Sequence, residues 1–370
     1  MRYQGSYKPF DPTPIKTYPL KVRENKVEVE GFADIAALAK GPVAAPTTPW
    51  FRNGYRGEGP DQSAGLAELA KYLVACRKAG KPVVVLSGGH PIKNGQNPIV
   101  IDLMRRGLVT LYATNVAATI HSFELALTGA SSESVRDALP KGEFGMAFET
   151  GHYLNYAQKV GYEHGYGLGE CMGRLYGDAE FRKRVLDRVF ADYPDTGDYF
   201  KPYDGFPYAD SCVYAAAWKH RIPICVHASL GFDIIDQLPS FDGQAKGATS
   251  GADFEIFTHE MCKFSGGGVI LTFGSAVMAP EVTLKAISMA ANVGAPPDGL
   301  WTGDFDIRPF VFDDDVRDES QYYYYLRDQK SLATRIPKVF GGVGFYFQGL
   351  HAQTISAFYQ SILRELGELA

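Results

Sequence analysis

IPICVHASLGFDIID, residues 222 to 236, is the stretch that decides the fold. An apolar run of strand length ends in His227 and Ser229, and a glycine follows at position 231. Three other runs have the same form and lead into helical patterns: VVVLSGG (83 to 89), VTLYATN (109 to 115) and GVILTFGS (268 to 275). Strands that are covered on both faces need not alternate apolar with polar residues, so this pattern predicts a parallel sheet with crossover helices.

Outward from these strands, the sequence predicts one large domain of the α/β class: a doubly wound, mostly parallel sheet with helices on both faces. Residues 65 to 80 and 350 to 366 have the periodicity of amphipathic helices. Further strands are expected at 144 to 149 and 342 to 349. Residues 1 to 60 are rich in proline, and we expect an irregular segment that wraps over the main body or a partner subunit.

Within the domain of residues 61 to 370, two insertions are expected. The first covers about 151 to 208 and contains a helix around 179 to 190. The second covers about 296 to 338 and contains the acidic run DDDVRDE (313 to 319) and the cluster YYYYL (322 to 326). A tyrosine cluster is typical of packing or of a subunit interface.

Composition narrows the class of partner. The chain has 370 residues, 45% of them hydrophobic, and a net charge of -5 without a basic run, so neither nucleic acid nor an anionic membrane is indicated. The first residues lack the apolar core of a signal peptide, and no apolar run has the length of a membrane span. Five scattered cysteines fit reduced thiols. We expect a cytoplasmic protein with a small-molecule ligand.

The first strand end supplies a candidate binding loop, SGGHPIKNG. In doubly wound sheets the ligand lies outside the carboxyl ends of the strands, where helix N-termini present free N–H groups. Ser87, Gly88 and Gly89 would let the backbone approach a cofactor, and His90 and Lys93 would face the substrate. A tight strand-to-helix turn is the other interpretation, because the loop matches neither of the common phosphate-binding spacings.

The second strand end places Asn115 before the segment IHSFE, which contains His121 and Glu124 three residues apart. On a helix that spacing puts both side chains on one face. The pair is interpreted as a general base with its orienting carboxylate, as two metal ligands, or as a surface hydrogen bond.

The third and fourth strand ends add polar and small residues. His227, Asp233 and Asp236 interrupt an apolar stretch, and such groups are costly to bury unless they are paired or used. Asp233 would accept ribose hydroxyls or cap a helix. Gly274 and Ser275 offer a backbone cradle for an anion, or simply close packing. In addition, Glu149 in FETGH and Asp236 are candidate substrate-binding carboxylates.

The segment from 209 to 236 resembles deoxyhypusine synthases in the order and spacing of several residues. These are Ser211, Tyr214, Lys219, Ile222, Pro223, Ser229, Leu230, Gly231 and Asp233, with Asn292 and Gly294 matching further on. The resemblance covers about 220 residues and implies NAD, a polyamine-like substrate and a homo-oligomer, either dimer or tetramer. It also implies a cofactor pocket formed by Ser87, Gly88, Gly89, Asn115, Asp233, Gly274 and Ser275.

The sequence departs from this family where the family performs its transfer reaction. Ala279 and Pro280 stand where the family has Lys-His, and no Trp-Gly-Lys motif follows Trp301, although that motif carries the imine-forming lysine. The leading hypothesis is an NAD-dependent enzyme acting on a small amine, a transferase of the deoxyhypusine or homospermidine synthase type or an internal redox enzyme. In it Glu124, His121 and His227 transfer protons or bind the amine, and no metal is required.

Two alternatives remain open from the sequence. The first is a lyase or hydrolase on the same fold, which uses His90, His121, Glu124, His227 and Asp233 around a metal or as acid and base. The second is a ligand-binding homologue without catalysis.

Overall fold

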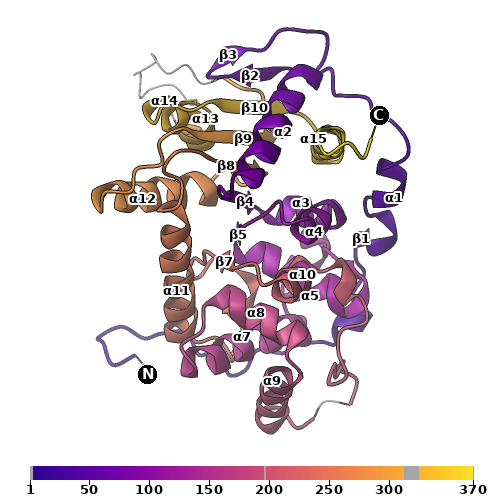
Figure 1. Cartoon of the computed structure of the whole chain (residues 1–370). Helices are drawn as coiled ribbons and strands as arrows, with labels where there is room; N and C mark the ends of the chain where they lie inside the picture. Colours follow the sequence, from indigo (N-terminus) through magenta and orange to yellow (C-terminus); the bar gives the residue numbers. More distant parts are fainter. Residues whose placement is uncertain (1–2, 196, 312–324, 370) are drawn as a thin grey trace.

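A computed structural model of the chain describes residues 3–195, 197–311 and 325–369. Within these ranges the centre is an eight-stranded sheet with the order β3-β2-β10-β9-β8-β4-β5-β7 (Figure 1). The strands are β2 (Trp50–Arg52), β3 (Tyr55–Arg56), β4 (Val83–Ser87), β5 (Leu111–Thr114), β7 (Ile224–Val226), β8 (Gly268–Phe273), β9 (Leu300–Asp306) and β10 (Gly344–Gln348). Neighbouring strands from β10 to β7 are parallel, whereas β2 and β3 pair antiparallel at one edge.

The strand order is that of a doubly wound sheet. The first parallel strand, β4, lies in the middle of the sheet. The chain then continues through β5 to β7 at one edge and returns to place β8 against the other side of β4. It then continues through β9 to β10 in the opposite direction. The direction of winding therefore reverses between β4 and β8, and this is the place where such sheets bind ligands. The predicted fold class and the predicted strands at 83 to 89, 109 to 115, 222 to 229, 268 to 275 and 342 to 349 are confirmed.

Helices cover both faces, as the alternation along β4 requires. Val83 and Val85 face one layer, whereas Val84 and Leu86 belong to the core on the opposite face. The first layer contains α2 (Ser63–Lys78), α3 (Gly89–Lys93), α4 (Asn97–Arg105), α5 (Val116–Thr128), α10 (Val213–His220) and α15 (His351–Glu365). The second contains α11 (Gly243–Met261), α12 (Met278–Asn292), a π-helical turn over Ser331–Arg335, and α14 (Ile336–Val339). The short helix α13 (Arg327–Lys330) directly precedes the π-helical turn.

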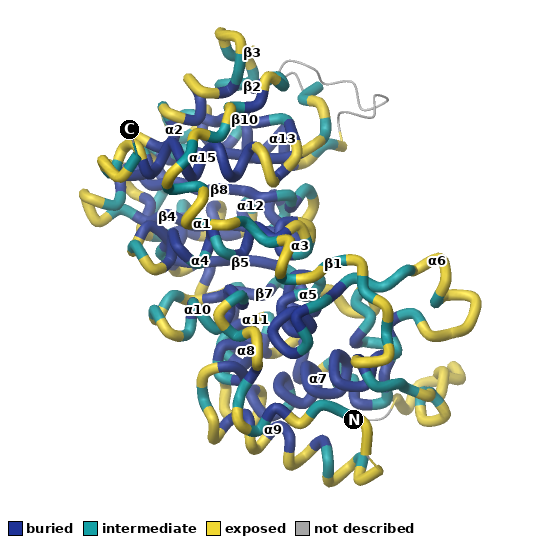
Figure 2. The backbone as a smooth tube through the Cα atoms, turned by 90° about the vertical axis from the view of Figure 1, so that its right-hand side faces the viewer, coloured by how far each residue is buried: buried dark blue, intermediate teal, exposed yellow. Residues whose placement is uncertain are grey.

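A helical lobe adjoins the β7 edge of the sheet. It consists of α7 (Phe148–Glu163), α8 (Leu168–Gly177) and α9 (Ala179–Asp192), with short α6 (Val135–Ala138) nearby. Figure 2 shows that the buried backbone runs without a break from the sheet into α7, while α6 and the N-terminal segment are exposed. Residues 15 to 31 cross this lobe and include β1 (Val27–Glu28), which pairs antiparallel with β6 (Ala130–Ser131). The segment 33 to 41 includes α1 (Ile35–Leu38).

Three details of the sequence prediction are wrong. Residues 144 to 149 do not form a strand, because Gly145 adopts a left-handed conformation (φ 77°) and α7 begins at Phe148. The segment 296 to 338 is not only an insertion beside the domain, because it contains β9, a strand inside the sheet. Residues 1 to 60 are not entirely irregular, since Asn53 and Gly54, both with positive φ, turn β2 into β3.

The acidic run 313 to 319 and most of the tyrosine cluster lie outside the described residues. In the ranges that are described, no helix combines the length and the apolar character that a bilayer crossing requires.

Candidate functional site

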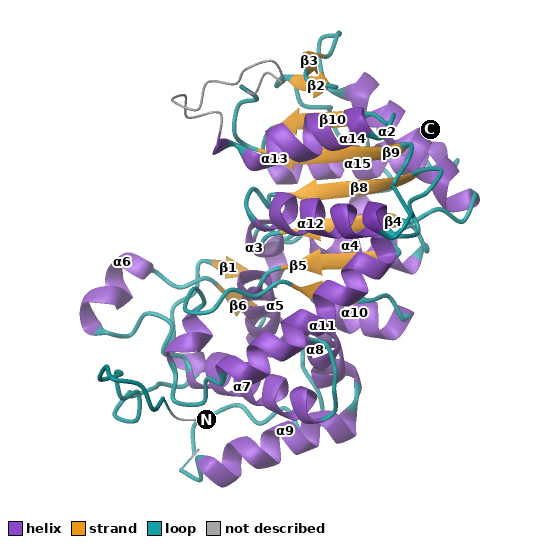
Figure 3. Ribbon diagram, turned by 90° about the vertical axis from the view of Figure 1, so that its left-hand side faces the viewer, coloured by secondary structure: helices purple, strands orange, loops and turns teal. Residues whose placement is uncertain are grey.

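The carboxyl ends of the parallel strands lie on one side of the molecule (Figure 3). At the reversal of winding, a crevice of about 370 Å³ opens between the loops after β4 and β8 and the first turn of α5. Eight of its lining residues were predicted at strand ends from the sequence: Gly88, Gly89, His90, Lys93, Asn115, His121, Gly274 and Ser275. The volume lies within the range of about 300–1,000 Å³ that small-molecule sites occupy.

Two glycines define the floor of this crevice. A Cβ atom on Gly88 would lie 2.4 Å from the carbonyl oxygen of Gly274, so the two loops touch. Gly274 has φ of 56°, and a Cβ atom there would lie 2.4 Å from Cε1 of His351. At Gly88 a larger residue would displace the backbone of Gly274, and at Gly274 it would displace the imidazole of His351. Because both positions are glycine, no side chain covers the main-chain groups of these two residues.

Helix N-termini supply positive electrostatic potential to the same crevice. Asn115 caps α5, its side chain accepting a hydrogen bond from the N–H of Ala118. Ser275 lies before α12, and its hydroxyl accepts from the N–H of Ala279 at 3.3 Å. Both helices are long, 13 and 15 residues, so their aligned peptide dipoles favour an anion at this end. The end of β5 carries Asn115 where many dinucleotide-binding sheets have an acidic residue for the ribose.

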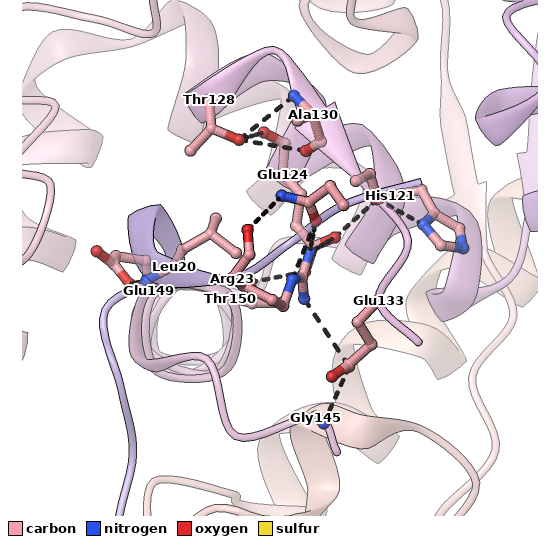
Figure 4. Close-up of polar contacts among 12 residues, drawn as sticks. Leu20, Arg23, His121, Glu124, Thr128, Ala130, Glu133, Gly145, Glu149 and Thr150 are labelled. Atoms are coloured by element: carbon pink, nitrogen blue, oxygen red, sulfur yellow. Dashed lines mark hydrogen bonds and ion pairs between the residues drawn. The ribbon is translucent and has the colours of Figure 1, made fainter. Parts of the chain in front are cut away.

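His121 takes part in a chain of hydrogen bonds that determines its tautomer (Figure 4). Its Nδ1 lies 2.7 Å from the hydroxyl of Ser131, and that hydroxyl donates to Oε2 of Glu124 at 2.7 Å. A carboxylate can only accept, so the single hydroxyl proton points to Glu124 and Nδ1–H of His121 must donate to Ser131. Nε2 of the neutral ring is therefore a proton acceptor. Burial lowers the pKa of His121, which favours this neutral form at physiological pH.

Glu124 is held ionised by a buried arginine from the N-terminal segment. Arg23 donates to both carboxylate oxygens at 2.8 and 2.7 Å, and Thr150 donates to Oε1 at 2.9 Å. Burial alone would raise the pKa of Glu124, but the Arg23 guanidinium lowers it below its ordinary value. Both oxygens are thus engaged within the chain, and the carboxylate orients Ser131 and His121 from behind.

A second cavity of about 220 Å³ adjoins the crevice. The two share Lys93, Ala117 and His121 in their walls. Glu124 and Glu133 line only the second cavity. His121 therefore lies between a crevice with bare main-chain groups and a smaller, mostly apolar chamber.

Other predicted residues lie apart from both cavities. His227 follows β7 and packs edge-on against Phe257, with ring centroids 5.2 Å apart, and its buried Nε2 has no hydrogen-bond partner in the described ranges. Burial lowers its pKa to about 4. Asp233 and Asp236 bind the ammonium of Lys246 at 2.8 and 2.6 Å. The lysine side chain is fully buried, so these two carboxylates fix the loop after β7.

Two of the predicted site residues, Glu149 and Ser87, form hydrogen bonds with the backbone. Glu149 lies in the first turn of α7 and accepts from the N–H groups of Leu20 at 2.7 Å and Phe200 at 2.9 Å. Burial raises its pKa. Ser87, at the end of β4, donates to the carbonyl of Gly88 at 2.9 Å and is almost fully buried.

Sequence reasoning missed three residues: His351 and Arg23 beside the two cavities, and Lys246 against the loop after β7. His351 begins α15 directly after β10, and its ring lies 5.5 Å from that of His90. Applying the strand-end rule to the run at 342 to 349 would have found it. Arg23 carried no local signal, because its partner Glu124 lies 101 residues away. Lys246 carried none because it lies on α11, a different element from the loop that contains Asp233 and Asp236.

A larger cavity of about 730 Å³ lies at the amino end of β7, between α8 and α10, and includes Gly173 and Trp218 in its wall. It shares no lining residue with the crevice at the carboxyl ends of the strands or with the smaller cavity beside His121. Among the described residues, no three His, Cys, Asp or Glu side chains are grouped so as to hold a metal ion.

Comparisons with known proteins give distant likenesses only. No protein-family model and no curated protein matches the sequence. Among solved structures, the apo arginine dihydrolase ArgZ from cyanobacteria is 15% identical (TM-score 0.42), with 83% of this chain and 32% of that chain covered. AgrE in complex with ornithine and NAD+ is 16% identical (TM-score 0.42; 83% and 33%). A conserved putative LOR/SDH protein from Methanococcus maripaludis S2 is 14% identical (TM-score 0.43; 89% and 74%). The chain thus spans about a third of the arginine dihydrolase structures.

Proposed function

We propose that this chain is an enzyme that binds NAD in the crevice between β4 and β8 and oxidises a small amine, with His121 as the proton acceptor. The observation that carries the proposal is the position of His121: a half-buried imidazole, whose Nε2 makes no hydrogen bond to the described residues, borders a crevice at the reversal of winding. The resemblance to deoxyhypusine synthases in residues 209 to 236 supports the same cofactor.

The residues of the crevice fit a dinucleotide. The touching loops at Gly88 and Gly274 would accept the pyrophosphate against main-chain groups, and the N-termini of α5 and α12 would face its negative charge. Asn115 would meet a ribose hydroxyl through its amide. Bound NAD would supply a hydride acceptor. Because an amide does not repel a phosphate as a carboxylate would, NADP is to be tested beside NAD.

The residues of this chain would perform the proton transfer and the positioning. Nε2 of His121 would take a proton from the amine nitrogen, and the resulting imidazolium would be stabilised through Ser131 by the Glu124 carboxylate. Ser131 and Glu124 are positioning residues in this scheme. Group transfer of the deoxyhypusine synthase type would need an imine-forming lysine, whose motif the sequence lacks, so oxidation is the reaction that we favour.

The experiment is a titration with cofactor and a pH profile. Isothermal titration with NAD and NADP should show saturable binding to the wild-type chain, and Gly274→Val should abolish it, because its side chain would collide with His351 and displace the loop that forms the crevice floor. Turnover of amines should depend on one group that must be unprotonated, with a pKa below the ordinary histidine value. His121→Gln should remove this limb while cofactor binding persists. Absence of NAD and NADP binding would refute the proposal.

A lyase or hydrolase that uses the same base without a dinucleotide is the second candidate. The His121, Ser131 and Glu124 relay favours it as well, since the relay prepares a base for any proton abstraction. Activity that needs His121 in a chain that binds neither cofactor would establish this class. Assembly as a dimer or tetramer, also implied by the resemblance, stays a prediction for light scattering.

A further inference from the structure

The chamber beside His121 has walls suited to a short aliphatic molecule. Its volume of about 220 Å³ is below that of sites for drug-sized ligands. Ile120, Val135, Phe144 and Ile234 contribute apolar surface to it. The chamber shares Lys93, Ala117 and His121 with the proposed cofactor crevice, so a molecule inside it would contact the proton acceptor.

Two of the four charged side chains in this chamber neutralise each other. Arg23 and Glu124 form a two-pronged ion pair, with side chains 6% and 2% exposed, and both carboxylate oxygens are occupied. Neither group offers a free charge to a ligand. The charge available for recognition must therefore come from the two others, Lys93 and Glu133.

Lys93 and Glu133 each retain bonding capacity. In the described part of the chain, the ammonium of Lys93 makes no hydrogen bond or ion pair. Oε1 of Glu133 accepts from the N–H of Gly145 at 3.0 Å and lies 3.8 Å from Arg23. Among the residues that the structure describes, its Oε2 has only a long contact of 3.5 Å with the hydroxyl of Tyr18. One cation and one anion thus remain in an apolar chamber.

We infer that the substrate of this site is a compact zwitterion, an aliphatic α-amino acid, whose ammonium binds Glu133 and whose carboxylate binds Lys93. The inference rests on the proposed function for the reaction, although the binding claim stands on the chamber alone. A diamine or polyamine carries no anion for Lys93 and brings a second positive charge toward it, so its binding is disfavoured. A simple amine leaves Lys93 unpaired, and a simple acid leaves Glu133 unpaired.

A matched set of ligands tests this by isothermal titration in the absence of cofactor. The probes are L-norvaline, butylamine, which lacks its carboxylate, pentanoate, which lacks its amine, and 1,4-diaminobutane. Norvaline should bind at least tenfold tighter than each of the others, because a charge-assisted hydrogen bond of about 1.5 kcal/mol corresponds to about tenfold in Kd. Tighter binding of 1,4-diaminobutane than of norvaline would overturn the inference.

Variants assign the two contacts. Glu133→Gln should weaken norvaline about tenfold while pentanoate binding stays within twofold, and Lys93→Gln should weaken norvaline but not butylamine. Lys78→Gln, an exposed position on α2, is the control and should change nothing. Circular dichroism confirms folding of each variant. If norvaline binds to both variants as tightly as to the wild-type chain, the inference fails.

A parallel NAD titration separates this inference from the proposed function. NAD binding without preference for norvaline refutes only the zwitterion. Norvaline preference without binding of NAD or NADP supports the chamber assignment and refutes the cofactor.

Discussion

Replacement of Arg23 by glutamine should destabilise the chain more than loss of an ordinary surface ion pair. Arg23 and Glu124 are 6% and 2% exposed, so the change leaves a buried carboxylate without its counter-charge. Breaking a buried pair by removing one partner costs about 3–5 kcal/mol. The matched control is Arg52→Gln, because Arg52 binds Glu68 at 2.9 Å with both side chains about 40% exposed. That change should cost less than about 1 kcal/mol.

The assay is urea denaturation followed by circular dichroism at pH 7 and pH 5. At pH 7 the difference between the two variants should be about 3 kcal/mol. Arg23 keeps the pKa of Glu124 below its ordinary value, so the wild-type pair contributes its stability above the unfolded pKa and loses it as the pH falls. In Arg23→Gln burial instead raises the pKa of Glu124, and its protonation should shrink the deficit at pH 5.

The double variant Arg23→Gln with Glu124→Gln completes the cycle. It should be more stable than the sum of the single changes predicts, because the two residues interact directly. The reasoning is refuted if Arg23→Gln costs no more than Arg52→Gln, or if the two single changes are additive.

Three further predictions concern the rest of the site. Gly88→Ala should weaken NAD binding at least tenfold in a titration, since its Cβ atom would meet backbone at 2.4 Å, whereas Gly247→Ala, with open space around it, should leave binding unchanged. Lys246→Met should cost about 3–5 kcal/mol in urea denaturation by leaving two aspartates unpaired, and a cost below 1 kcal/mol would contradict this. His227, with pKa about 4, binds its proton first in the unfolded chain, so stability should decrease as the pH falls from about 6.5 to 4. His227→Gln should flatten that slope, and an unchanged slope would exclude His227 as its cause.

The parallel strands could be predicted from the sequence because each is a short, continuous apolar run. β9 escaped prediction for a physical reason: its alternating Asp304 and Asp306 give a buried strand a polar appearance. Arg308 beside them binds Asp306 and Asp328 and so compensates those two charges, whereas burial raises the pKa of Asp304 well above its ordinary value. The hairpin of β2 and β3, by contrast, carried a readable Asn-Gly turn signal.

The crevice itself follows from the strand-end rule, since the residues of three loops meet wherever parallel strands end together. What the sequence does not contain is the partner of each charge. Glu124 binds Arg23, which lies 101 positions earlier in the sequence. Because of this ion pair, Glu124 is not a free carboxylate but an ionised group that orients Ser131 and His121. Asp233 and Asp236 are likewise occupied by Lys246, on a helix that sequence reasoning did not connect with them.

The N-terminal segment therefore does more than cover the lobe. β1 pairs with β6 and so fixes Ser131, while Arg23 on the same segment keeps Glu124 ionised. Both conditions are needed for Ser131 to direct its proton to Glu124 and for Nε2 of His121 to remain a proton acceptor. Since residues 20 to 31 supply both, His121 has its proton-accepting tautomer only when this segment is packed against the lobe.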